Sequence, residues 1–118
     1  MNLFENLNTY KENTIPTLKP FEKTDWFGWG GANKFPDGSE PLIAHGEFAT
    51  MIVGGGDTPE DDPIVYIDYG DPDEGTAHFA TKGFETKDDA IRAGHKYIGL
   101  LNEPIDENEL KALGFYSI

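Results

Sequence analysis

The sequence predicts a single α+β domain spanning residues 1–118, in which an antiparallel meander sheet of three to four strands carries a short N-terminal helix and a longer C-terminal helix packed on it. A chain of 118 residues suits one domain and is too short for two ordinary ones. Apolar residues repeat at helical spacing near both ends and alternate in the middle. Connections between the expected strands are short, which favours antiparallel neighbours.

The N-terminal part predicts a short helix followed by extended chain. Asn2 and Glu5 have the spacing of a capping box, and apolar residues then repeat at helical spacing, so we expect a helix over residues 3–12. Two prolines in residues 13–20 indicate an extended connector. The aromatic residues of 21–29 are typical of a strand, and its glycine-rich end suggests a bulge.

The central part predicts the rest of the sheet. Residues 36–39, Pro-Asp-Gly-Ser, have the composition of a turn. Alternating side chains predict strands over residues 42–53 and 76–82. The β-branched and aromatic residues 64–69 are the strongest strand signal in the chain.

The C-terminal part predicts two helices. Thr86, followed by two aspartates, marks the start of the longer helix, and Pro104 ends it. Asp106 caps a short second helix, which Gly114 stops. Residues 115–118 then either form an edge strand or pack against the domain.

The long helix is expected to cover one face of the sheet, while the other face is partly covered by the first helix or left open. Gly94 and Gly99 lower the helix propensity of this segment. Their expected benefit is a close approach of the helix to the sheet.

Composition excludes several kinds of site and anchor. The chain has no cysteine, so it has neither disulfides nor thiolate metal sites. Residues 1–10 do not have the pattern of a signal peptide. No apolar stretch approaches the roughly 20 residues that span a bilayer. We therefore expect a cytoplasmic protein without a membrane partner.

No motif for catalysis or cofactor binding is present. Neither a Ser-His-Asp arrangement nor a G-x-S-x-G elbow can be defended. The glycine-rich segments 28–31 and 54–56 lack the following helix and lysine of a phosphate-binding loop. Residues 68–75 are acidic but lack the ligand spacing of a calcium-binding loop. The three histidines, which match no zinc signature, are His45, His78 and His95. We expect no catalytic residue, no metal site and no cofactor.

Charge is the outlying property of the sequence. Lys and Arg number 9 against 22 Asp and Glu, which gives a formal net charge of -13. Residues 35–81 contain no Lys or Arg but hold half of the acids, mostly in the loops that follow the strands expected at 42–53 and 64–69. Such a surface repels nucleic acid and anionic lipid and attracts basic surfaces. The alternative is that charged loops only keep sheet edges from aggregating.

Two sets of residues are the candidate contacts with a basic partner. The charged set is Asp57, Glu60, Asp61, Asp62, Asp68, Asp71, Asp73 and Glu74. Trp26 and Phe27 are adjacent, so in a strand they face opposite sides and one of them is available as an interface anchor. The candidate anchors are Trp26, Trp29 and Tyr69.

These features favour a small acidic inhibitor that occupies the nucleic-acid-binding groove of a basic protein or ribonucleoprotein complex. In size and charge the chain resembles phage proteins that block CRISPR or restriction systems, and bacterial immunity proteins against nuclease toxins. The resemblance is one of kind, without a shared motif, so it assigns no residue roles. For a phage protein, the compartment would be the host cytoplasm. The second hypothesis is a non-inhibitory interaction or structural module, including one that self-associates, and a metal-dependent hydrolase is the least favoured. We expect no direct nucleic-acid binding, and the oligomeric state stays open.

Overall fold

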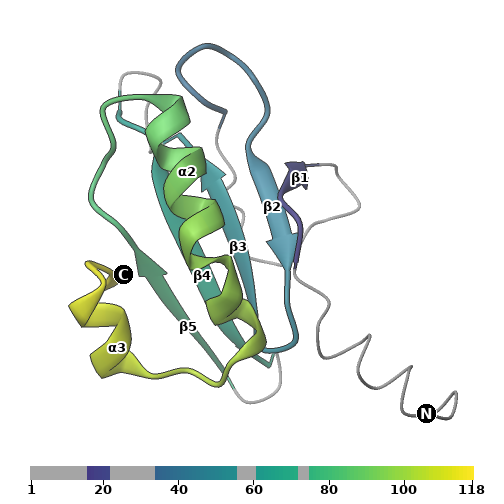
Figure 1. The fold of residues 1–118 in the computed structure, drawn as a ribbon, viewed down its shortest axis with the longest axis vertical. Coiled ribbons are helices and arrows are strands. Elements are labelled where there is room, and N and C mark those ends of the chain that lie inside the picture. The colour runs from purple at the N-terminus through teal and green to yellow at the C-terminus, as the bar shows by residue number, and fades with distance from the viewer. Residues whose placement is uncertain (1–15, 22–33, 56–60, 72–74) are drawn as a thin grey trace, which may run out of the picture.

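The structure is a computed structural model that describes residues 16–21, 34–55, 61–71 and 75–118 (Figure 1). Within these ranges it contains one antiparallel sheet of six strands, in which every strand pairs with its neighbour in sequence. The α+β class and the antiparallel meander are therefore confirmed, whereas the expected number of three to four strands is too low. The strands are β1 (Lys19–Pro20), β2 (Leu42–His45), β3 (Ala49–Gly54), β4 (Ile64–Asp71), β5 (Gly75–Ala80) and β6 (Tyr116–Ser117).

The main error in the expected strand count lies in residues 42–53, which form a hairpin instead of one strand. The chain reverses between β2 and β3, where the Gly46 backbone N–H donates to the Ala49 carbonyl at 2.8 Å. The register pairs Leu42 with Val53 and His45 with Thr50. The alternation of apolar residues continues with the same period on both sides of the turn, so it does not reveal the reversal.

The other additional strands are the two shortest. β1 lies in the segment expected to be a connector, and β6 confirms the edge-strand alternative for the C-terminal residues. The helix expected over residues 3–12 and nearly all of the strand expected over 21–29 lie outside the described residues.

The long helix begins where the sequence predicts. α2 spans Lys87–Tyr97, and the Thr86 hydroxyl caps it by accepting a hydrogen bond from the Asp89 backbone N–H at 3.1 Å. The chain then tightens into the 3-10 helix η2 (Ile98–Asn102), which ends before Pro104.

The second helix is also confirmed. α3 spans Glu107–Ala112, and the Asp106 carboxylate accepts from the Glu109 backbone N–H at 3.1 Å. Gly114, with φ of +99°, stops the helix in a conformation that favours glycine. Within the described part of the chain, no helix has the length and apolar character needed to cross a membrane.

α2 and η2 lie across one face of the sheet, with the larger core between them (Figure 1). Met51, Val53 and Ile67 are fully buried in this core. A Cβ on Gly94 would lie 2.7 Å from Val53 Cγ2, so the expected close approach of helix to sheet is confirmed there. Gly99 has open space around it, so the same expectation is wrong at that position.

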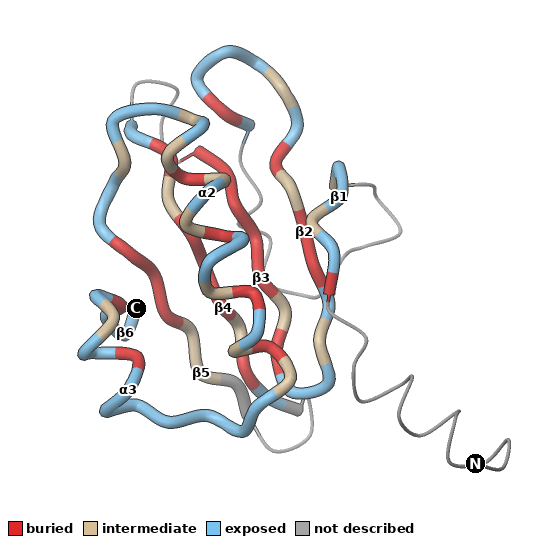
Figure 2. The backbone as a smooth tube through the Cα atoms, in the orientation of Figure 1, coloured by how far each residue is buried: buried red, intermediate tan, exposed pale blue. Residues whose placement is uncertain are grey.

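The opposite face of the sheet contains a second buried cluster. Ile43, Ile52, Tyr66 and Ala80 are direct neighbours across β2, β3, β4 and β5, and all are buried. Phe21 and Ile64 pack against this cluster. In Figure 2 the central strands β3 and β4 are buried along most of their length, which reflects the clusters on both faces. At this level of the sheet, the second face is thus closed to solvent rather than open.

Candidate functional site

The predicted contact residues divide into those that the structure describes and those that it does not. Trp26, Trp29, Asp57, Glu60, Asp73 and Glu74 lie outside the described residues. Asp71 ends β4, and only its backbone is described. The placement of the charged and aromatic contacts is therefore known for Asp61, Asp62, Asp68 and Tyr69.

Asp61 and Asp62 are exposed and lie immediately before β4. The segment that leads to α2 runs beside them, because the Phe84 backbone N–H donates to the Pro63 carbonyl at 2.8 Å. Gly83 in this segment lies close to Asp62, because a Cβ added to Gly83 would be only 2.6 Å from the Cβ of Asp62. The structure thus presents these two carboxylates at one end of the sheet, as the hypothesis of an acidic contact surface requires.

Asp68 and Tyr69 are placed differently, because both side chains are engaged inside the protein. The Tyr69 side chain is only 4% exposed, packs edge-on against Phe79 and donates its hydroxyl to the Leu100 carbonyl at 3.4 Å. The Asp68 carboxylate is 13% exposed, and its Oδ1 lies 3.3 Å from His78 Nδ1. Neither residue is presented to a partner as Asp61 and Asp62 are.

Asp68 belongs to a row of polar side chains that crosses four strands. His45, Thr50, Asp68 and His78 are successive cross-strand neighbours in β2, β3, β4 and β5. By strand alternation they lie on the face opposite α2, beside the second cluster. His45 Nδ1 and Thr50 Oγ1 are 3.2 Å apart. Among the described residues, no group of three or more His, Asp or Glu side chains is arranged to hold a metal ion.

The environment of Asp68 favours its neutral form. Burial raises the pKa of its carboxyl above the ordinary value of 3.8, and the nearby charge of His78 opposes this only in part. The folded protein therefore holds the proton more tightly than the unfolded chain. The carboxyl lowers stability increasingly as the pH rises from 3.8 through the folded pKa, and the full penalty applies above that pKa.

Asp68→Asn is accordingly expected to raise the midpoint of thermal unfolding at pH 7, because the amide has nearly the same shape and carries no charge to desolvate. The advantage over the wild type should shrink as the pH falls towards 3.8. Melting curves of the variant and the wild type, recorded at the same series of pH values from neutral to acid, measure this difference in unfolding midpoint. An advantage that grew towards acid pH would contradict this account of the pair.

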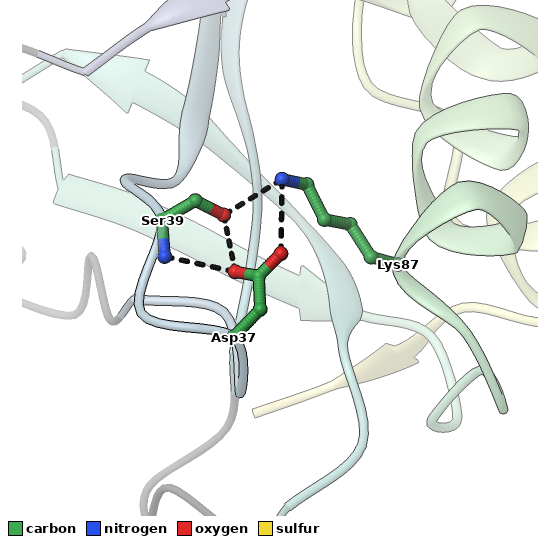
Figure 3. Close-up of polar contacts among 3 residues, drawn as sticks. All are labelled: Asp37, Ser39 and Lys87. Atoms are coloured by element: carbon green, nitrogen blue, oxygen red, sulfur yellow. Dashed lines mark hydrogen bonds and ion pairs between the residues drawn. The ribbon is translucent and has the colours of Figure 1, made fainter.

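Near the start of α2, acids have basic partners. Asp37 accepts hydrogen bonds from the backbone and hydroxyl of Ser39, and Lys87 Nζ lies 3.4 Å from Asp37 Oδ2 and 2.7 Å from Ser39 Oγ (Figure 3). The two Ser39 hydrogen bonds are the main reason that the pKa of Asp37 is lowered, and Lys87 adds to them. Lys87 also lies 4.9 Å from the centre of the Phe35 ring. The predicted turn at residues 36–39 is confirmed. Its contacts with Lys87 connect the loop before β2 to the start of α2.

Two further ion pairs lie in the same region. Lys34 pairs with Glu40 at 3.4 Å, and Arg92 pairs with Asp89 at 3.1 Å. Exposed pairs of this kind contribute little stability. They do reduce the negative charge that this part of the surface presents.

The other end of the sheet has an acidic segment that the sequence reasoning missed. Four acids lie within positions 103–109, all exposed, and no ion pair within the described part of the chain involves them. They are Glu103, Asp106, Glu107 and Glu109. Glu47, in the β2–β3 turn, lies at this end too, because its backbone N–H donates to Asn102 Oδ1 at 2.9 Å. The run of acids is visible in the sequence, but the capping pattern at Asp106 indicates only the start of a helix.

A groove separates η2 from α3 beside these acids, and we call it the η2–α3 groove. Its narrower part has a volume of about 200 Å³ and is lined by residues that include Tyr69, Leu110 and Asp106. A wider part of about 530 Å³ includes Tyr97, Leu113 and Lys96. Leu100, Glu103 and Glu109 line both parts, so they form one continuous depression.

The negative charge of this groove reaches the buried Tyr69 side chain. Burial first, and then the charges of Glu103 and Glu109, raise the pKa of Tyr69 to about 12. A cation is therefore favoured in the groove and an anion is disfavoured.

The chain matches no protein-family model, no curated protein and no solved structure.

Proposed function

We propose that this chain is a small acidic inhibitor, which binds the basic nucleic-acid-binding surface of a partner and so excludes nucleic acid from it. The observation that carries the proposal is the distribution of charge. Eleven of the 22 acids lie in residues 35–81, where there is no Lys or Arg. Exposed Asp61 and Asp62 at one end of the sheet, and Glu47 and Glu103 at the other, support it.

The spacing of these acids suits a surface built for nucleic acid. β4 has eight residues, so its ends are about 23 Å apart at roughly 3.3 Å per residue. Duplex DNA carries one charge per about 1.7 Å, so a stretch of that length carries about 14 phosphates. Lys and Arg side chains placed to neutralise phosphates would also attract these carboxylates.

Inhibition by this route requires no catalysis. Opposite charges would steer the two proteins together, so association would be fast. Its rate would fall as the salt concentration rises. The partner would be a nuclease or a nucleoprotein complex, and the chain itself would be an inhibitor of the anti-CRISPR, anti-restriction or toxin-immunity kind. Both proteins would meet in the cytoplasm, which is that of the host if the chain is phage-encoded.

The test starts with immobilised protein that captures partners from a lysate at about 50 mM salt and releases them at about 300 mM. A captured protein counts only if duplex DNA or RNA competes for it, and if the chain displaces nucleic acid from it in a mobility-shift assay. We expect Asp61→Lys with Asp62→Lys, and separately Glu103→Lys with Glu107→Lys, to weaken this displacement by at least about tenfold.

The matched control reverses Glu85 and Asp88 to Lys, which changes the net charge equally at two exposed acids that lie outside residues 35–81 and 103–109. It should retain displacement to within about threefold, since only the long-range attraction changes. The proposal is wrong if the control weakens displacement as much as the other two variants, or if nucleic acid does not compete.

A self-associating module remains a second candidate, which one observation favours. β6 pairs with only Phe79 and Ala80 of β5, so in the described structure the outer edge of β5 at residues 75–77 has no paired strand. Such an edge can pair with a second copy. An elution volume that decreases with rising concentration would favour this module, whereas a constant volume favours the inhibitor.

A further inference from the structure

The narrower part of the η2–α3 groove has the size of a single side chain. Pockets for drug-sized ligands begin at about 300 Å³. The narrower part of the groove, at about 200 Å³, is smaller than that, and the wider part opens towards solvent. A nucleotide or an organic cofactor is therefore too large for the enclosed end, whereas one side chain entering from a partner fits.

The walls of the groove combine an apolar floor with a negative rim. Leu100 and Leu113 are half-buried and Leu110 is buried, so the floor offers apolar contact to an aliphatic chain. Glu103 and Glu109 stand on both parts of the rim. Lysine and arginine have an apolar stem and a charged end, which this combination matches.

One basic side chain of the protein itself already lies along the outer wall. Lys96 Nζ is 5.5 Å from the centre of the Tyr97 ring, and both residues line the wider part of the groove. This distance is typical of a cation held by an aromatic face. A basic side chain of the protein therefore already lies against the wall of the wider part, next to an aromatic ring.

We propose that the η2–α3 groove binds one arginine side chain of the partner, with the guanidinium between Glu103 and Glu109 and the stem on Leu100. Arginine is favoured over lysine because its planar end has five donors and can bridge two carboxylates. The proposal rests on the proposed function, since it names the kind of residue by which a basic partner would be held at this end of the sheet.

The test uses N-acetyl-arginine amide as the probe and the equivalent citrulline amide as its uncharged control of the same shape. Backbone amide signals of the intact protein are followed by NMR during titration. We expect saturable shifts centred on Leu100, Glu103 and Glu109, with a dissociation constant on the order of millimolar, as befits one side chain. The citrulline amide should cause no such shifts.

Three variants make the result specific. Glu103→Gln with Glu109→Gln should weaken arginine-amide binding at least fivefold. Glu107→Gln removes one negative charge, half as many as the double variant, at a residue of α3 that lines neither part of the groove, so it should change the affinity by less than twofold. Lys96→Ala should strengthen binding, because it removes the competing cation.

The proposal is overturned by shifts spread evenly over all acidic segments, by equal binding of the citrulline amide, or by calcium ions shifting the same signals at lower concentration. These outcomes are distinguishable from failure of the proposed function. If arginine amide does not bind but the Asp61 and Asp62 reversals still abolish displacement of nucleic acid, the groove assignment alone is wrong. If arginine amide binds but nucleic acid does not compete for the partner, the groove stands and the inhibitor function is wrong.

Discussion

Gly46→Ala is expected to lower the free energy of unfolding by about 3 kcal/mol, although it adds only one methyl group. A Cβ at this position would lie 2.3 Å from Leu101 Cβ and 2.4 Å from the Leu101 carbonyl oxygen. The carbonyl belongs to the backbone, so no change of rotamer relieves the contact. The turn would have to move away from η2, which would weaken the hydrogen bond of 2.8 Å from the Phe48 backbone N–H to Leu101.

Urea unfolding measures this effect as a lower midpoint, and thermal unfolding should show a decrease of roughly 10 °C for a chain of this size. Gly99→Ala is the matched control, because it makes the same chemical change where no atom lies within 4 Å. It should be neutral or stabilising by up to about 1 kcal/mol. Equal stability of the Gly46 variant and the wild type would mean that the hairpin turn does not contact η2 as closely as the structure shows.

Ile52→Ala is expected to cost about 3 kcal/mol, within the usual range for removing a buried isoleucine side chain. Ile52 is 1% exposed and lies on the sheet face opposite α2, between its cross-strand neighbours Ile43 and Tyr66. The substitution therefore asks whether this second face is a packed core. On a face open to solvent, the same truncation would cost well under 1 kcal/mol.

The control for Ile52 is Ile105→Ala, since Ile105 is 42% exposed in the connection before α3. It should change stability by no more than about 0.5 kcal/mol. The two variants are compared by urea unfolding, with the slope of the transition used to check that both unfold in the same way. Similar small losses in both would contradict the burial of the second face.

The two ends of the sheet differ in how far basic side chains of the protein neutralise their negative charge. Near the start of α2, Lys87 pairs with Asp37 and Arg92 pairs with Asp89. At the η2–α3 end, the four acids of residues 103–109 have no ion pair within the described ranges. The carboxylates at this end are therefore less neutralised by the protein's own basic side chains, which is why the arginine site is proposed there.

The sequence by itself determined the features that depend on neighbours along the chain. The Thr86 and Asp106 caps, the turn at residues 36–39 and the Gly114 stop each follow from local hydrogen bonding or local backbone geometry, and the structure confirms them. The strand over residues 64–69 follows from β-branched and aromatic side chains. The excess of acidic residues is a property of composition and needs no fold.

Only the tertiary structure decided which distant residues meet. The reversal at Gly46 depends on its contact with Leu101, and the engagement of Asp68 depends on a strand partner that carries His78. Whether a carboxylate is neutralised depends likewise on a cation up to 50 positions away, as Lys87 and Asp37 show. Periodicity and capping describe the chain over a few residues, so they carry no information about these contacts, and the acidic groove between η2 and α3 exists only because two such segments fold against each other.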